Sequence, residues 1–338
     1  MRRASLVAFC LLATSPQTRA QSLGDTLPVT GDIVGIHDPV IIRERDAYYI
    51  YGTNGDEPAA TIRIRSSSDL IHWTKRGHVF AKLPDWATQA VPGADGAWAP
   101  DISKVNDRYL LYYSVSTFGS NRSVIGLATN ETLDPAATNY RWRDEGLVIE
   151  TTRASDWNAI DPNHVIDRQG RHWLTLGSYW TGIKLFELNP VTGKLLEAGE
   201  RPVSLARRRA PVGAGTPVEA PFIVNRPDHY YLFVSYDYCC KGVDSTYYVV
   251  VGRSRKITGP YVGRDGTRLL DGEGTMFIPV FAEDGRFRGQ GHNGFLHDDD
   301  GRDYVVYHAY DRQLGGKPVL RISPVVWGAD GWPSLATR

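Results

Sequence analysis

Three acidic residues and one histidine stand beside short motifs that resemble one another. Asp38 and Asp161 each precede a proline, Glu219 precedes an Ala-Pro pair, and His292 precedes an asparagine. Two carboxyl groups on either side of a glycosidic bond are the groups that hydrolyse it. One carries a proton for the leaving oxygen, and the other is ionised and acts on water or on the anomeric carbon. A third carboxylate can raise the pKa of the acid by repulsion. This chemistry requires a fold that brings the residues together.

The four residues fall at equivalent places in a motif that occurs five times. The motif is anchored by Pro39, Pro100, Pro162, Pro221 and Asn293, which recur about once every 60 residues. Each unit begins as a strand and continues through a turn that carries charged residues or glycine. A second strand follows, rich in tyrosine and β-branched residues. The chain therefore consists of strand-rich repeats.

A repeat of this length suits a four-stranded sheet with its loops, and such sheets arranged radially make a β-propeller. Long capped stretches with helical periodicity are missing from the sequence. We therefore predict an all-β protein, a five-bladed β-propeller, with residues 21–338 as a single domain. A pair of β-sandwiches is the alternative. In a propeller, equivalent positions of all blades converge on the central axis, so the three carboxylates and His292 should meet there.

The composition excludes several classes of protein. The 338 residues include 38 basic and 38 acidic side chains, so no basic excess exists to bind nucleic acid. After the first 20 residues, no apolar run is long enough to cross a membrane. The 34 Gly, 20 Pro, 18 Tyr and 9 Trp favour turns and strands. We expect a monomer, since no pattern in the sequence indicates an interface.

The N-terminus has the pattern of a secretory signal peptide. Two arginines follow Met1, an apolar stretch spans residues 4–13, and small residues end at Ala20. We predict a signal peptide at residues 1–20 and a secreted protein, extracellular or periplasmic; a short buried helix is the alternative. Its removal leaves Cys239 and Cys240, either as free thiols or as a vicinal disulfide. An adjacent pair cannot link distant segments, so a large apolar core must stabilise the fold.

Nine stretches, in this order along the chain, make the sequence resemble glycoside hydrolase family 43, and within it the endo-1,5-α-L-arabinanases. They lie at residues 36–39, 98–102, 112–120, 158–163, 177–185, 218–221, 238–243, 291–294 and 307–311. The resemblance implies a five-bladed propeller that hydrolyses linear arabinan with inversion. It also implies that Asp38 is the general base that activates water and that Glu219 is the general acid. Asp161 is then the third carboxylate, which raises the pKa of the acid and orients it and the sugar.

The same resemblance implies a set of residues that bind the substrate. They are His37, Trp98, Phe118, Gly119, Asn158, Ala159, Ile160, Ser178, Tyr179 and Trp180. Sugars have apolar faces that suit flat aromatic rings, beside polar groups that fix the hydroxyls. We expect His37 to hold the base or the sugar. For Trp98 and Phe118, packing between blades is the alternative. His308 lies in a family-like motif, but the sequence assigns it no role.

His292 resembles an axial histidine that lies beside a metal ion in arabinanases. We expect a single calcium ion there, held largely by water, because calcium prefers oxygen ligands to one imidazole. A histidine that is hydrogen-bonded in the channel without a metal is the alternative.

The function expected from the sequence is cleavage of internal bonds in linear arabinan and its oligosaccharides. An exo-acting α-L-arabinofuranosidase or a β-xylosidase on the same fold is the first alternative. A sugar-binding propeller without catalysis is the second, but binding alone does not require an acid–base pair.

Overall fold

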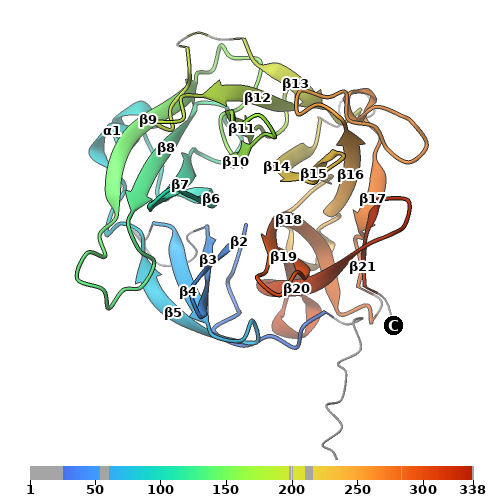
Figure 1. Ribbon diagram of the computed structural model, residues 1–338, viewed down its shortest axis with the longest axis horizontal. Helices are drawn as coiled ribbons and strands as arrows, with labels where there is room; N and C mark the ends of the chain where they lie inside the picture. Colours follow the sequence, from blue (N-terminus) through green and yellow to red (C-terminus); the bar gives the residue numbers. More distant parts are fainter. Residues whose placement is uncertain are drawn as a thin grey trace, which may run out of the picture.

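A computed structural model describes residues 26–53, 61–197, 199, 201–209, 216–282 and 284–336. Five sheets surround a central axis, as Figure 1 shows, and each sheet is one blade. The predicted five-bladed β-propeller is confirmed, and the β-sandwich alternative is wrong. The predicted signal peptide at residues 1–20 lies outside the described residues.

The blades follow the chain in order. Blade 1 contains β1 (Thr30–Gly31), β2 (Val40–Glu44), β3 (Ala47–Gly52), β4 (Arg63–Ser67) and β5 (His72–His78). Blade 2 contains β6 (Trp98–Val105), β7 (Arg108–Val115), β8 (Ser123–Asn130) and β9 (Arg143–Thr151). Blade 3 contains β10 (Asn163–Ile166), β11 (His172–Leu176), β12 (Ile183–Leu188) and β13 (Val203–Ala206). Blade 4 contains β14 (Val218–Asn225), β15 (Tyr230–Tyr236), β16 (Tyr248–Ser254) and β17 (Thr275–Ile278). Blade 5 contains β18 (Phe287–His297), β19 (Asp303–Asp311), β20 (Lys317–Trp327) and β21 (Pro333–Leu335).

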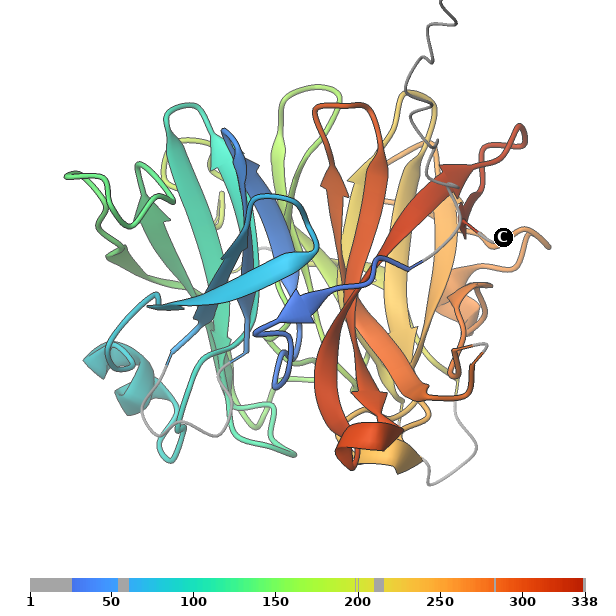
Figure 2. The same ribbon diagram turned by 90° about the horizontal axis from the view of Figure 1, so that it is seen from below.

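Helices are short. They are α1 (Asp85–Ala90) and the 3-10 helices η1 (Gly242–Asp244), η2 (Leu269–Asp271) and η3 (Arg312–Leu314). In the side view of Figure 2, α1, η1 and η3 lie toward the same face of the disc. The helix α1 precedes the inner strand β6, whereas η1 and η3 lie in the loops β15–β16 and β19–β20. Among the described residues, no helix combines the length and the apolar character needed to cross a membrane.

The apolar core lies between the blades. Each of the five main clusters of buried residues contains side chains from two neighbouring blades, and the cluster around Trp73 and Leu320 joins blade 5 to blade 1. Because each sheet packs against a neighbour on both faces, its middle strands are apolar on both sides. In β15, all seven residues are buried. This explains why the tyrosine-rich strands lack simple alternation of polar and apolar residues.

The N-terminal segment closes the ring. The backbone N–H of Leu27 donates to the carbonyl of Ile322 in β20 at 2.8 Å, and Leu320 N–H donates to Ile33 at 3.0 Å. In the same segment, β1 pairs in parallel with β5 of blade 1. The chain start therefore joins the last blade to the first, which brings residues near 38 beside residues near 308.

Candidate active site

The inner end of every blade carries one residue in the left-handed backbone region. These residues are Asp38, Ala99, Asp161, Ala220 and His292, with φ angles of 51°, 41°, 58°, 54° and 50°. Each directly precedes one of the five anchor residues found in the sequence. This conformation is uncommon for residues other than glycine and often marks functional sites. Asp38, Asp161 and His292 are themselves the left-handed residues of their blades. In blade 4 the left-handed residue is Ala220, so Glu219 lies one position earlier.

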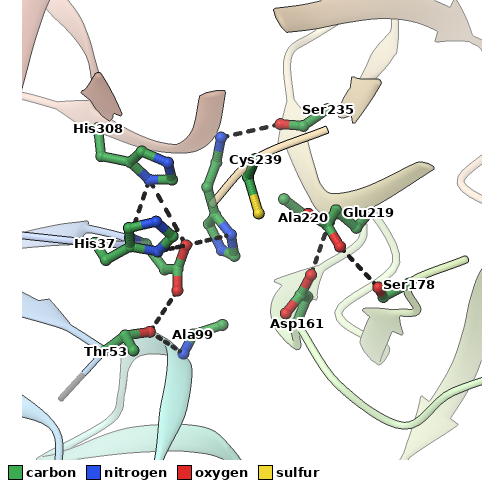
Figure 3. Close-up of polar contacts among 12 residues, drawn as sticks. His37, Thr53, Ala99, Asp161, Ser178, Glu219, Ala220, Ser235, Cys239 and His308 are labelled. Atoms are coloured by element: carbon green, nitrogen blue, oxygen red, sulfur yellow. Dashed lines mark hydrogen bonds and ion pairs between the residues drawn. The ribbon is translucent and has the colours of Figure 1, made fainter. Parts of the chain in front are cut away.

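Asp38 lies in a cluster of polar groups at the start of β2 (Figure 3). Its Oδ1 is 2.8 Å from His37 Nδ1 and 3.0 Å from His292 Nδ1. Its Oδ2 accepts a short hydrogen bond from the hydroxyl of Thr53, which in turn accepts the N–H of Ala99 at 2.8 Å. Burial alone would raise the pKa of Asp38, but His37 and His292 lower it well below the usual range. Asp38 is therefore an ionised carboxylate, as a general base must be.

His308 is a site residue to which sequence reasoning assigned no role. Its ring stacks on that of His37 with centroids 3.8 Å apart, and its Nδ1 accepts the backbone N–H of Asp38 at 3.2 Å. The residue is fully buried, and burial holds its pKa well below the usual range, so the ring is neutral. The only sequence signal for this role was its place in the family-like stretch at residues 307–311.

Glu219 has a different environment at the start of β14. The hydroxyl of Ser178 donates to its Oε2 at 2.7 Å, and Tyr247 interacts with the carboxyl group and lowers its pKa. Burial raises the pKa of Glu219, and the charge of Asp38 adds to that shift. The hydroxyl of Ser178 and the charge of His292 oppose this shift without reversing it, so Glu219 retains a proton more readily than Asp38 does.

Asp161 lies between blades 3 and 4. Its Oδ2 accepts the N–H of Ala220 at 3.1 Å, and its own N–H donates to Ser114 Oγ at 3.0 Å. Burial raises the pKa of Asp161 to about 8, against the opposing effect of His292. The structure thus brings together all three carboxyl groups that the sequence singled out, and two of them favour the protonated form.

His292 joins the site from blade 5. Its backbone N–H donates to Ser235 Oγ at 2.9 Å, and its Nδ1 faces Asp38. Burial would lower its pKa, but the carboxylate of Asp38 raises it to about 9. With Nδ1 on Asp38, only Nε2 is left to face a metal ion. The amide of the next residue, Asn293, is buried and has neither its oxygen nor its nitrogen hydrogen-bonded, as expected for a group that meets a bound water or ion.

The predicted aromatic residues differ in how exposed they are. Phe118 is 86% exposed, Gly119 beside it is exposed, and Trp180 is 37% exposed. Trp98 is half-buried at the start of β6. Packing between blades is therefore wrong as an explanation for Phe118, whose ring is free to meet a ligand.

The stretch from Asn158 to Ile160 is buried. Asn158 accepts a hydrogen bond from Ser123 Oγ at 2.6 Å and donates to the carbonyl of Ser120 at 3.4 Å. Ala159 is 0% exposed and belongs to the core between blades 2 and 3, and Ile160 is 9% exposed. In this structure the side chain of Ala159 packs in the core, and Asn158 holds the loop that carries Phe118.

Ser178 and Tyr179 follow β11. Ser178 is buried and faces Glu219, whereas Tyr179 is half-buried in a left-handed conformation with φ 55°. Its N–H donates to the carbonyl of Val218 at 2.8 Å, which ties this loop to the strand of the acid. Of the predicted substrate-binding residues, Ser178 thus has the most direct contact with a presumed catalytic group.

Comparisons with known proteins agree with this site. The model of the glycosyl hydrolases family 43 matches residues 33–333. The extracellular exo-α-(1→5)-L-arabinofuranosidase ArbA of Cellvibrio japonicus is 41% identical, over 89% of this chain and 86% of its own. The extracellular endo-α-(1→5)-L-arabinanase 1 of Bacillus subtilis is 39% identical, over 88% of this chain and 87% of its own.

A solved structure shows the same architecture. The Cellvibrio cellulosa α-L-arabinanase complexed with arabinohexaose matches with a TM-score of 0.82 and 39% identity, over 90% of this chain and 96% of that one. A family model that spans nearly the whole propeller and relatives of this identity are sufficient to establish the family. The chain belongs to the glycosyl hydrolases of family 43 and is a glycosidase.

Proposed function

We propose that this glycosidase cleaves internal α-1,5-L-arabinofuranosidic bonds of linear arabinan by an inverting mechanism. The observation that carries the proposal is the contrast between two carboxyl groups at one axis. Asp38 contacts two imidazoles and a hydroxyl, whereas Glu219 is half-buried and accepts a hydrogen bond from the hydroxyl of Ser178. The first environment favours a carboxylate and the second a carboxylic acid, which are the two forms that hydrolysis needs.

In the proposed mechanism, Asp38 removes a proton from a water molecule as that water attacks the anomeric carbon. Glu219 donates its proton to the oxygen of the leaving sugar. Inversion requires the two carboxyl groups to be roughly 6.5–9.5 Å apart, so that the water fits between them and the sugar. Asp161 orients the strand of the acid through the N–H of Ala220. Phe118 and Trp180 offer flat faces for the sugar rings along the rim.

Calcium is part of the proposal as a structural ion near His292. His292 Nε2 and the unsatisfied amide of Asn293 would face it, with water as the remaining ligands. Bound there, the ion would supply positive charge at the base of the pocket. Every proton transfer in the mechanism is carried out by the carboxyl groups of the chain.

The substrate and the compartment are inferred from the relatives. One is named an extracellular endo-arabinanase and another an extracellular exo-arabinofuranosidase, and a third was solved with arabinohexaose. Together with the N-terminal pattern of residues 1–20, these names support a secreted enzyme that acts on arabinan and arabino-oligosaccharides. A monomer stays part of the proposal only because no pattern in the sequence indicates an interface.

The experiment that tests the proposal is a time course on linear arabinan, arabino-oligosaccharides and xylan, with products sized at each point. Early release of a ladder of oligosaccharides from arabinan supports internal cleavage. Release of one short product from the first minutes onward would instead support the exo-acting candidate, which the 41% identity to an exo-arabinofuranosidase favours. Proton NMR of the newly formed anomeric centre distinguishes inversion from retention.

A further inference from the structure

Cys239 and Cys240 form a disulfide in the loop between β15 and β16. Figure 3 shows Cys239 between the histidines around Asp38 and the pair Glu219–Ala220. The Sγ atom of Cys240 is 4.0 Å from His37 Nε2. The disulfide therefore lies within the active site, although it links no distant segments and the proposed mechanism does not use it.

A chain of hydrogen bonds runs from this disulfide to the general base. The backbone N–H of Cys240 donates to the hydroxyl oxygen of Tyr310 at 2.7 Å. The same oxygen is 2.8 Å from His37 Nε2, and His37 Nδ1 is 2.8 Å from Asp38 Oδ1. Tyr310 is buried in β19, so its position is set by blade 5 while the cysteines belong to blade 4. Three blades thus meet in one series of polar contacts.

The directions of these hydrogen bonds follow from the donors available. The oxygen of Tyr310 accepts the N–H of Cys240 and also interacts with Ser245, and the hydroxyl has one proton to donate. Its proton is therefore available for His37 Nε2, which then acts as the acceptor. A neutral imidazole with Nε2 as acceptor carries its proton on Nδ1. The carboxylate of Asp38 can only accept, so this proton lies between His37 Nδ1 and Asp38 Oδ1, and the hydroxyl of Tyr310 stabilises the same tautomer by donating to Nε2.

The disulfide holds the donor of this series in place. Cys240 has a left-handed backbone with φ 65°, which residues other than glycine seldom adopt. Linking it to its neighbour closes a small ring that restricts this backbone. The loop is tied on either side, by Thr246 N–H to Tyr238 O at 2.9 Å and by Lys241 N–H to Ser245 Oγ at 3.0 Å. Opening the ring removes the restriction at the residue whose N–H reaches Tyr310.

We propose that Tyr310 and the Cys239–Cys240 disulfide are positioning residues for the general base. They hold His37 in the tautomer and orientation that fix Asp38 toward the attacking water. This inference rests on the proposed hydrolytic mechanism. It assigns a function to the cysteine pair, which the repeat pattern and the catalytic motifs leave unexplained, and it makes the activity dependent on the oxidised state of the pair.

The first test is Tyr310→Phe, which removes the hydroxyl and keeps the ring. We expect kcat on arabinan to fall at least about tenfold with KM nearly unchanged, because a catalytic group misplaced by ~1 Å can cost about 100-fold. The loss should persist on an aryl arabinofuranoside, since base catalysis is needed whatever the leaving group. The matched control is Tyr261→Phe, a buried tyrosine in blade 4 whose hydroxyl donates to Ile257 O at 2.9 Å. Its kinetics should equal those of the wild type.

The second test is opening the disulfide. A dithiol such as dithiothreitol gives two electrons and two protons to the pair, which becomes two thiols while the reagent closes to its own disulfide. We expect kcat to fall on reduction and to return on reoxidation, with mass spectrometry after alkylation reporting the state of the pair. The double variant Cys239→Ala/Cys240→Ala should have a lower kcat than the oxidised wild type, both with and without dithiothreitol.

Tyr310 and the disulfide act as one unit only if the losses of kcat that follow from changing each are not additive. Tyr310→Phe combined with Cys239→Ala/Cys240→Ala should lose about as much kcat as either change alone. Additive losses of kcat would overturn the proposed positioning role, and so would full activity of Tyr310→Phe or of the reduced wild type. If the cysteine variant fails to fold, reduction of the folded wild type and of Tyr310→Phe makes the same comparison. A wild type that does not cleave arabinan would contradict the proposed function instead.

Discussion

The carboxyl group of Asp161 accepts the backbone N–H of Ala220 at 3.1 Å, which ties a side chain of blade 3 to the strand of blade 4 that carries Glu219. Ala220 is the left-handed residue of that strand, so this hydrogen bond acts where the backbone is least regular. Burial is the largest cause of the raised pKa of Glu219. Among the charged groups, His292 lowers this pKa and Asp38 raises it. In the proposed mechanism, Asp161 therefore acts mainly by orienting the acid.

This view of Asp161 predicts a difference between two substitutions. Because burial raises the pKa of Asp161 to about 8, the group is largely protonated at pH 7, and an asparagine resembles it. Asp161→Asn keeps an oxygen for Ala220 N–H, whereas Asp161→Ala leaves that donor without a partner. We expect Asp161→Ala to lower kcat on arabinan by about 100-fold and Asp161→Asn by clearly less. Equal losses in steady-state assays would show that the negative charge matters more than the hydrogen bond.

The alkaline side of the activity profile should report the ionisation of Glu219. A general acid works only while it holds its proton, and burial raises the pKa of this group above its usual value. Activity on arabinan should thus persist above the ordinary glutamic acid pKa of about 4.3 and fall as the pH rises through the raised value. The measurement is kcat/KM against pH on arabino-oligosaccharides. A decline that starts at or below pH 4 would contradict the assignment.

The loss of activity on removing the general acid should depend on the leaving group of the substrate. We expect Glu219→Ala to lower arabinan cleavage by at least about 100-fold and to affect aryl substrates with acidic leaving groups much less, because these need little protonation. Asp38→Ala should lose activity on both, since the water still needs a base. Rates on arabinan and on a nitrophenyl arabinofuranoside provide the comparison. Glu150→Gln, an exposed residue of β9, is the control and should match the wild type on both substrates.

The proposed ion predicts an effect of chelation that depends on His292. Dialysis against a strong chelator should lower kcat or the melting temperature, and added calcium should restore it. His292→Ala should be impaired from the start and respond little to either treatment. His297→Ala, an exposed residue at the end of the same strand, serves as the control. An enzyme with the same activity and melting temperature after metal removal, verified by elemental analysis, would exclude the ion.

A buried aspartate outside the catalytic carboxyls should matter for stability. Asp101 in β6 is 3% exposed and accepts His164 N–H at 2.7 Å and Asn163 Nδ2 at 3.2 Å, which links blade 2 to blade 3. Asp101→Ala leaves both donors unsatisfied, so the free energy of unfolding should fall by about 3 kcal/mol. Asp107→Ala, in the exposed turn that follows β6, should change it by less than about 0.5 kcal/mol. Denaturant titration measures both.

The loss of stability caused by Asp101→Ala should also depend on pH. Burial raises the pKa of Asp101 to about 6, so the folded protein binds a proton here more tightly than the unfolded chain does. The stability that this protonation contributes is full below the unfolded pKa of about 3.9 and is lost as the pH rises through the folded value. The difference between wild type and Asp101→Ala should be larger at pH 4 than at pH 7. A difference that grows with pH would contradict the raised pKa.

Much of the fold was predictable from the sequence because the repeat is local. Each unit carries its own anchor and its own tyrosine-rich strand, and these patterns specify strands and turns over short distances. The number of blades follows from the number of anchors. The identities of Asp38, Asp161 and Glu219 were predictable for the same reason, since each stands beside an anchor in its unit.

The contacts among these residues depend on how the ring closes, which no local pattern encodes. His308 reaches Asp38 across 270 positions and Tyr310 reaches His37 across 273, because the N-terminal segment binds blade 5 and sets blade 1 beside it. Likewise, burial determines which carboxyl groups hold protons, and burial is a property of the packed blades. The sequence by itself determined the blades and the acidic residues that stand beside their anchors. The tertiary structure decided which of them is charged and what holds each in place, because pKa and orientation depend on neighbours that only the closed ring brings together.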